Sequence, residues 1–103
     1  MQGKINSFGS ALRAIRERKK LLLRQAAAHL EVDTAYVSKL ERGEKRATKE
    51  QVLKLAEFYA TPEEHLLELW LADKVMLALQ GEKQSEQAIK LVSKKFKTLK
   101  KKK

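Results

Sequence analysis

Two short segments with helical periodicity, separated by only a few residues, constrain the fold of this chain more than any other feature. They cover about residues 23–30 and 34–42, "LRQAAAHL" and "TAYVSKLER". Asp33 is a good N-cap for the second segment, and Gly43 provides a C-terminal stop. The apolar residues that we expect to face a core are Ala27, Leu30, Val32, Val37 and Leu40. The pattern predicts two helices joined by a tight turn.

The rest of the chain also has helical periodicity, which predicts an all-α fold. Alanine, leucine, lysine and glutamate are abundant, alternating strand patterns are scarce, and 103 residues allow one domain with a modest core. The expected N-caps are Ser7, Thr48 (with Gln51) and Ser85, and Thr61 precedes a proline that can occupy the first helical position. The further predicted helices cover residues 7–20, 48–60, 62–80 and 85–96.

Most of the positive charge lies at the C-terminal end. The net charge is +10, but residues 94–103 hold seven lysines and no acidic residue, so the remaining residues are only mildly basic. Such a tail attracts polyanions through a term that is independent of their sequence, and it is equally well explained as a solvated extension. Charge alone therefore does not establish nucleic-acid binding.

Several classes of function lack the residues that they need. No cysteine is present, which excludes disulfides, thiol catalysis and thiolate metal sites. His29 and His65 have no partner at metal-ligand spacing, so we expect no metal site and no cofactor. No nucleophile motif or phosphate-binding glycine loop supports an enzyme. No apolar run approaches the roughly 18 residues of a membrane span and no signal peptide is evident, so we expect a cytoplasmic protein without a membrane or small-molecule partner.

The paired helices have the pattern of a helix-turn-helix unit. A helix is narrow enough to enter the DNA major groove, where base edges present distinguishable donors and acceptors. The second helix of such a unit presents its N-terminal residues to the bases, so it needs small or polar residues there and apolar residues behind them. The stretch "VDTAYVSKLERG" meets both demands. The alternative is an ordinary helical hairpin whose solvent-facing side happens to hold these residues.

At this point the sequence resembles the Cro/cI-type, or Xre-type, helix-turn-helix regulators. The resemblance covers about residues 8–61 and is carried by "FGSALRAIRERKK", "AAHLEVDTAYVSKLERGEKR" and "TKEQVLKLAEFY". It implies a five-helix, lambda-repressor-like DNA-binding domain that works as a dimer on a palindromic operator. Here a C-terminal helical extension would follow that domain.

The resemblance also assigns functional positions. The base-facing positions correspond to Thr34, Ala35, Ser38 and Lys39. Tyr36 corresponds to a position that often contacts phosphate, and the loop that lies along the DNA backbone corresponds to Arg42, Lys45 and Arg46. Asp33, at the start of the recognition helix, belongs to the same predicted DNA-binding surface. Phosphate contacts position a protein on DNA, whereas base contacts specify the sequence.

The sequence departs from the family pattern at two positions. The glutamine that the family often uses on the DNA backbone is Leu23 here, and we expect the adjacent Arg24 to take its place. The turn between the two helices usually has glycine, and this chain has Glu31. If the turn keeps a positive φ there, Glu31 costs on the order of 1 kcal/mol.

The helix expected at 62–80 is apolar around most of its circumference, so something must cover it. We expect a homodimer interface that includes Leu66, Leu69, Trp70, Val75 and Leu79, with Trp70 as the central anchor. The alternative is a monomer in which the last helix folds back and closes the core. The expected division of the chain is a DNA-binding domain (1–61), helices that complete the core and the dimer interface (62–96), and a lysine-rich tail (97–103).

The sequence thus predicts a regulator of transcription that binds double-stranded DNA sequence-specifically and is associated with the nucleoid of a bacterium, or encoded by a phage. Restriction–modification controller proteins and phage-type repressors are similar in size. A DNA-binding antitoxin is the main alternative, in which the apolar C-terminal helices bind a toxin. A protein-interaction module that lost DNA binding is disfavoured by the small, polar and basic residues of the recognition helix.

Overall fold

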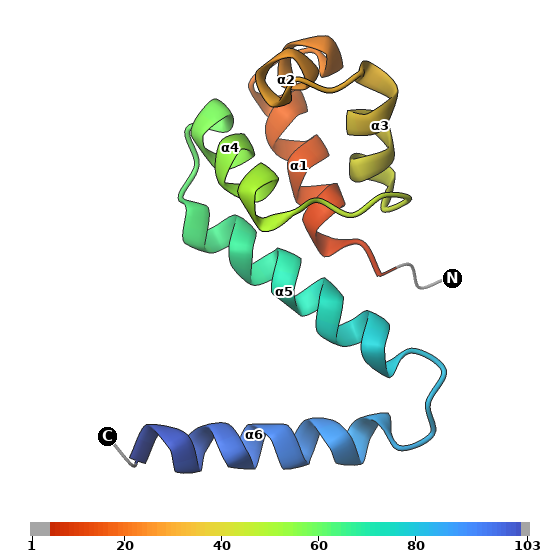
Figure 1. The fold of residues 1–103 in the computed structure, drawn as a ribbon, viewed down its shortest axis with the longest axis vertical. Coiled ribbons are helices and arrows are strands. Elements are labelled where there is room, and N and C mark those ends of the chain that lie inside the picture. Colours follow the sequence, from red (N-terminus) through yellow and green to blue (C-terminus); the bar gives the residue numbers. More distant parts are fainter. Residues whose placement is uncertain (1–4, 102–103) are drawn as a thin grey trace.

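Six helices make up the part of the chain that the structure, a computed structural model, describes (residues 5–101) (Figure 1). They are α1 (Ser7–Arg18), α2 (Leu23–Leu30), α3 (Thr34–Arg42), α4 (Lys49–Tyr59), α5 (Glu63–Leu79) and α6 (Ser85–Lys101). No strand occurs within those residues, and the predicted all-α fold is confirmed.

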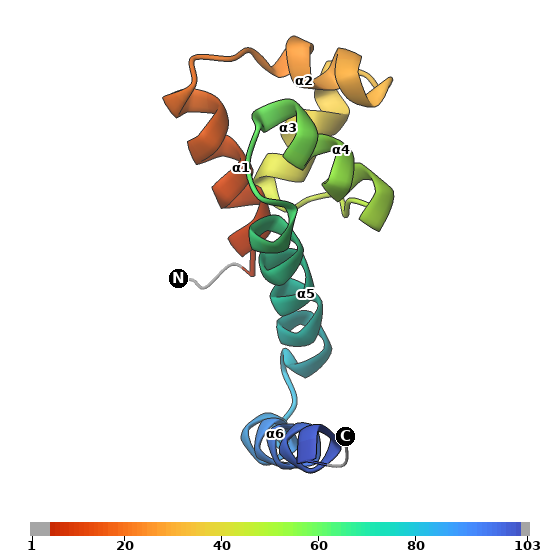
Figure 2. The ribbon, with the colours of Figure 1, turned by 90° about the vertical axis from the view of Figure 1, so that its left-hand side faces the viewer.

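The first five helices form one body around a shared core, and α6 lies apart from it (Figures 1 and 2). α3 packs on α1 and α2, α4 packs on α2 and α5, and α5 also packs on α1. The core residues include all but one of the expected inward-facing residues of α2 and α3, because Val32 is only partly buried. The largest fully buried side chains are Leu12, Val37, Leu40, Val52, Leu55, Tyr59 and Leu66. The short helices α2 and α3 thus pack on each other, and each also packs on a longer helix, α4 or α1.

Two predicted helix starts are confirmed and three are wrong. The Thr48 hydroxyl accepts from the Gln51 amide at 3.1 Å, and the Gln51 side chain accepts from the Thr48 amide at 3.0 Å, so the predicted capping box forms. Asp33 caps α3 in the same way through the amide of Tyr36. Ser7, in contrast, is the first residue of α1 and does not cap it. Ser85 is likewise the first residue of α6, and its hydroxyl donates to the Leu79 and Glu82 carbonyls. Pro62, not Thr61, occupies the N-cap of α5, which has no side-chain cap.

The N-terminus of α1 is capped by a side chain of α5, which is distant in the sequence. The buried carboxylate of Asp73, on α5, accepts from the amide of Ser7 at 3.0 Å and from the amide of Phe8 at 2.9 Å. A carboxylate is favourable there because unpaired amides and the helix dipole make a helix N-terminus positive. This tertiary cap ties α5 to α1 and explains why a charged residue is buried in the body.

α1 and α3 approach each other closely enough to require a glycine. A Cβ atom at Gly9 would lie 2.4 Å from the carbonyl oxygen of Leu40 and 2.7 Å from that of Glu41, which are backbone atoms that cannot move aside. Asn6 donates from its side chain to the Glu41 carbonyl at 2.9 Å, and it satisfies part of the free C-terminal end of α3. The position of α3 is therefore set by backbone contact with α1.

A buried ion pair joins the same two helices. Arg16 donates from Nε to the Glu41 carboxylate at 2.7 Å and from Nη2 at 3.1 Å, and its Nη1 donates to the Leu21 carbonyl. The hydrogen bonds that Arg16 donates to the Glu41 carboxylate raise the pKa of Arg16, so this arginine stays charged. Glu41 therefore points inward to α1 and does not pair with Arg42, its neighbour in the sequence.

The structure of the C-terminal helices differs in part from the predicted homodimer interface. Leu66 is fully buried in the chain's own core, so it is not available to a second subunit. Trp70 is partly buried against that core and donates from its indole nitrogen to the Ala47 carbonyl at 2.8 Å, which makes it an anchor within the chain. The expectation that the last helix helps to complete the core is also wrong, since residues 89–100 of α6 are exposed.

We predict that Glu41→Ala lowers the free energy of unfolding by about 3–5 kcal/mol, because it leaves the Arg16 charge buried without a partner. Urea unfolding followed by circular dichroism measures this value. The control is Glu17→Ala, which removes an exposed ion pair with Arg13 and should cost less than about 1 kcal/mol. The double variant Arg16→Met/Glu41→Leu should regain most of the lost stability. Equal losses of stability in Glu41→Ala and Glu17→Ala would contradict the prediction.

Candidate nucleic-acid interface

The turn between α2 and α3 keeps its shape without glycine. Glu31 has a φ of 62°, the left-handed conformation that this family's usual glycine would adopt easily. The amide of Val32 donates to the Ala27 carbonyl at 3.0 Å, and the amide of Glu31 donates to the Ala28 carbonyl at 3.2 Å. These bonds close the C-terminus of α2. The turn therefore keeps the positive φ at Glu31 for which we expected an energetic cost.

The first residues of α3 are presented outward from a rigid cap. Asp33 has extended backbone, and its carboxylate accepts from the amide of Tyr36 at 2.8 Å. Because the carboxylate is occupied and negative, it orients the helix and does not offer a phosphate ligand. We therefore assign Asp33 to positioning rather than to DNA contact.

α3 separates its buried and exposed residues as a reading helix requires. Val37 and Leu40 are buried in the body. The four residues at the expected base-facing positions share the opposite side: Thr34, Ala35 and Lys39 are exposed, and Ser38 is half-buried. Ala35 and Lys39 also line a shallow depression with Lys45 from the following loop. The structure thus brings the start of α3 and the basic loop together on one surface.

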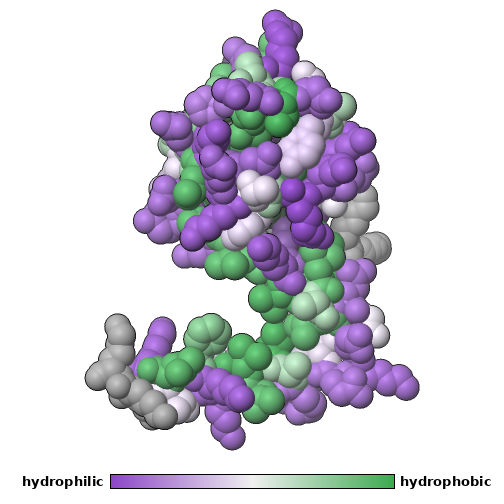
Figure 3. Space-filling model, in the orientation of Figure 1, coloured by the Kyte–Doolittle hydropathy of each residue, from purple (hydrophilic) through white to green (hydrophobic). Residues whose placement is uncertain are grey.

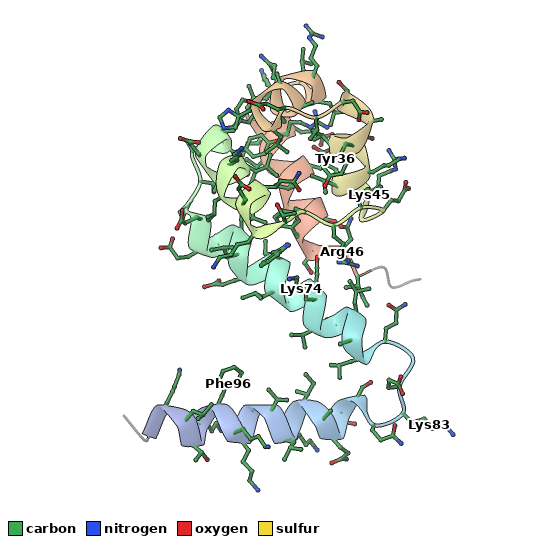
Figure 4. The ribbon with its side chains drawn as sticks, in the orientation of Figure 1. Tyr36, Lys45, Arg46, Lys74, Lys83 and Phe96 are labelled. Atoms are coloured by element: carbon green, nitrogen blue, oxygen red, sulfur yellow. The ribbon has the colours of Figure 1, made fainter. Side chains whose placement is uncertain are left out.

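Tyr36 is used mainly inside the chain. Its hydroxyl lies 3.0 Å from the Gln51 side-chain oxygen and 3.3 Å from the Arg46 carbonyl, so its single hydrogen is shared between two acceptors (Figure 4). A phosphate oxygen also accepts, and it would have to compete with Gln51 for that hydrogen. Tyr36 therefore holds α3 against the loop and α4, a role that sequence reasoning missed.

The expected cations differ in whether they are already paired. Four of them form no ion pair with any residue between 5 and 101: Arg24, Lys39, Lys45 and Arg46. Arg42 is different, because its guanidinium donates to Glu44 at 2.9 Å and 3.1 Å and also to the Ser38 hydroxyl. The hydrogen bonds that Arg42 donates to the Glu44 carboxylate raise the pKa of Arg42. The spacing of four residues between Ser38 and Arg42 signals their contact, but nothing in the sequence pattern singled out Glu44.

The remaining candidate groups do not gather into another site. His29 stacks against Phe58, with ring centroids 5.2 Å apart, and its Nε2 atom lies 3.5 Å from the Glu57 carboxylate. Over residues 5–101, no three His, Cys, Asp or Glu side chains are arranged to hold a metal ion. None of the helices in that range is long and apolar enough to cross a membrane.

The strained turn gives a stability prediction. A left-handed conformation costs a non-glycine residue about 1–2 kcal/mol. Glycine removes this strain, but it also raises the conformational entropy of the unfolded chain, which offsets part of the stabilisation. We predict that Glu31→Gly raises the free energy of unfolding by about 0.5–1 kcal/mol, measured by urea unfolding. Ala14→Gly, at an exposed position within α1, is the control and should lower it by about 1 kcal/mol. A loss of stability in both variants would mean that the turn carries no such strain.

Comparisons with known proteins agree with this geometry. Residues 7–69 match the family described as "Helix-turn-helix domain". A curated relative, the HTH-type transcriptional repressor RghR of Bacillus subtilis strain 168, is 39% identical over 64 residues. That match covers 61% of this chain and 47% of RghR, so the chain spans about half the length of that relative.

Two solved structures of the clp gene regulator ClgR from Corynebacterium glutamicum are similar to this fold. One has 26% identity and a TM-score of 0.59, and the match covers 69% of this chain and 94% of that one. The other has 25% identity and the same TM-score, with coverage of 85% and 88%. The family match, which spans most of the five-helix body, confirms the resemblance found in the sequence. The chain therefore belongs to the helix-turn-helix family of the Cro/cI, or Xre, type.

Proposed function

We propose that this protein is a transcriptional regulator that binds double-stranded DNA sequence-specifically, as a dimer on a palindromic operator. The observation that carries the proposal is the exposed side of α3, where small and polar residues are flanked by unpaired cations on a helix that is fixed to α1. Such a regulator works where the DNA is, in the cytoplasm and on the nucleoid of a bacterium.

The base-reading part of the proposal rests on the chemistry of four side chains. The Thr34 hydroxyl can bond a base edge, and the Ala35 methyl can contact a thymine methyl. Lys39 reaches farther and can donate to guanine acceptors, although as a point charge it discriminates less than a bidentate arginine. Ser38, half-buried beside Lys39, completes the group.

The phosphate-binding part rests on the unpaired cations. Lys45 and Arg46 lie in the loop after α3, on the same side of the body as Tyr36 (Figure 4). Because no acidic side chain of the described residues competes for them, they are free to bind DNA phosphates. Arg24, near the start of α2, is exposed and is the expected backbone contact of the first helix of the motif.

The dimer rests on apolar surface that this chain leaves open. Hydrophobic side chains gather on the second half of α5 and on the side of α6 that is turned toward it (Figure 3). The large exposed ones are Leu71, Val75, Met76, Ile89, Leu91, Val92, Phe96 and Leu99. The predicted interface residues Leu69 and Leu79 are partly exposed beside them. A helix surface of this kind needs a cover, and a two-fold partner would also provide the second half-site reader.

The charges of the two helices favour a second copy of the chain as that cover. Apart from Asp73, which is buried and caps α1 within the chain, α5 contains three acidic residues and one lysine, whereas α6 contains six lysines and one glutamate. α6 of one subunit therefore complements α5 of its partner, and two α6 helices would repel each other. A toxin bound on the same surface, as in a DNA-binding antitoxin, is the alternative. By likeness to RghR, we expect the protein to repress transcription. We also propose, more specifically, that it is a restriction–modification controller protein.

We predict that two single substitutions distinguish residues that contact bases from residues that contact phosphates. Lys39→Ala should relax the preference at particular operator positions, because it removes a base contact. Arg46→Ala should weaken binding to all sequences similarly and reduce the slope of log K against log salt by about 1, because it removes a phosphate contact. Selection from random duplexes followed by titrations at several salt concentrations measures both. An unchanged operator preference in Lys39→Ala would contradict the assignment of the reading face.

We predict that Phe96→Glu weakens dimerisation about tenfold or more, because Phe96 projects from α6 toward α5 into open apolar space (Figure 4). The control is Gln87→Glu, which adds the same charge at an exposed position of α6 that lies outside the apolar stripe. Sedimentation equilibrium with and without operator DNA measures the change. A wild-type chain that stays monomeric at micromolar concentration in both conditions would refute the dimer.

A further inference from the structure

Arg42, the last residue of α3, is the one expected phosphate ligand whose charge is already matched within the chain. Its guanidinium contacts the Glu44 carboxylate through two donors, at 2.9 Å and 3.1 Å, and a third donor is on the Ser38 hydroxyl. Arg46, only four residues farther, has no such partner among the described residues. A cation held by a fixed carboxylate offers a phosphate little net attraction, so Arg42 needs a different explanation.

The backbone makes this arrangement a fixed part of the turn. Gly43 has a φ of 77°, and a Cβ atom at this position would lie 2.8 Å from the Asn6 side chain, so glycine is required on two grounds. The chain then reverses, and the amide of Glu44 donates to the Lys39 carbonyl at 2.8 Å. This bond holds Glu44 beside the last turn of α3, where the spacing of four residues already places Arg42 next to Ser38.

We propose that Arg42 and Glu44 form a clamp that sets the direction of the Ser38 hydroxyl, so that Ser38 reads hydrogen-bond acceptors on the DNA. Arg42 is thus a positioning residue that acts through Ser38. The inference rests on the proposed function, because it specifies how one residue of the DNA-reading face works.

The chemistry of a serine hydroxyl explains the effect. The hydroxyl has one hydrogen to donate and two lone pairs that accept. A guanidinium only donates, so Arg42 takes a lone pair and leaves the Ser38 hydrogen unused. Ser38 donates to no acceptor within residues 5–101. Because the guanidinium repels the hydroxyl hydrogen, that hydrogen turns away from Arg42 and is left for an acceptor outside the chain.

A preference for particular bases follows. In the major groove guanine presents the acceptors N7 and O6, adenine presents N7, and thymine presents O4. Cytosine presents only its N4 donor. A serine that is free to rotate accepts from cytosine as readily as it donates to the others. The clamped Ser38 keeps its hydrogen for an acceptor and has only one lone pair left, so it favours the other three bases over cytosine. The clamp therefore turns a permissive residue into a selective one.

The test compares variants on operators that differ only at the base pair that Ser38 reads. Ser38→Ala, profiled on all single-base operator variants, identifies that base pair. Arg42→Ala should then lose the same preference, by roughly fivefold between the best base and cytosine, and the double variant should lose no more than either single variant. Glu44→Gln should weaken this preference while total affinity is kept or raised. Arg46→Ala is the matched control, with loss of one exposed cation and a uniform effect on all bases.

The outcomes separate this inference from the function on which it rests. If no variant or wild-type chain prefers any duplex, the proposed function fails. If the wild type does select an operator but Arg42→Ala behaves like Arg46→Ala, uniform across bases and additive with Ser38→Ala, Arg42 is an ordinary phosphate contact and the clamp is refuted. Circular dichroism of each variant separates both results from misfolding, because none of these residues is buried in the core and each spectrum should match that of the wild type.

Discussion

The contact between α1 and α3 is the constraint on which the rest of the structure depends. It combines three kinds of interaction: backbone approach at Gly9, the hydrogen bond from Asn6 to the C-terminal end of α3, and the buried pair of Arg16 with Glu41. All three act on the last turn of α3, at Leu40 and Glu41, in a helix of only nine residues that would not be stable alone. The reading face can be made of small and polar residues because the opposite side carries all the attachment.

Attachment at the C-terminal end of α3 is matched by a second set of bonds at its start. Tyr36 reaches Gln51, whose side-chain oxygen also caps α4 through the Thr48 amide. One oxygen therefore serves two helices, and the orientation of α3 is linked to the first turn of α4. Together with the Asp33 cap, these bonds leave the helix few ways to tilt, and a reader of base edges needs this rigidity.

The sequence predicted those parts of the molecule that depend on local rules. Helix periodicity, the Asp33 cap and the Thr48–Gln51 box involve neighbours within a few residues, so α2, α3 and α4 were placed within one or two residues of their bounds. Contacts between distant residues were missed. Asp73 and Ser7 are 66 positions apart, and Arg16 and Glu41 are 25 apart. The pattern of apolar residues also could not distinguish Leu66, which faces the core, from Val75, which faces solvent, because α5 is apolar on all sides.

The cap that Asp73 provides makes α5 a rigid arm with its fixed point at the N-terminus of α1. Everything beyond Asp73 on this helix turns in phase with it, including the exposed residues at which a partner would dock. One residue inserted after Asp73 would rotate that surface by about 100° and advance it by about 1.5 Å, without touching the body. In the proposed dimer, the length of α5 therefore sets the distance between the two α3 helices, so a change in this arm alone would match an operator of different spacing.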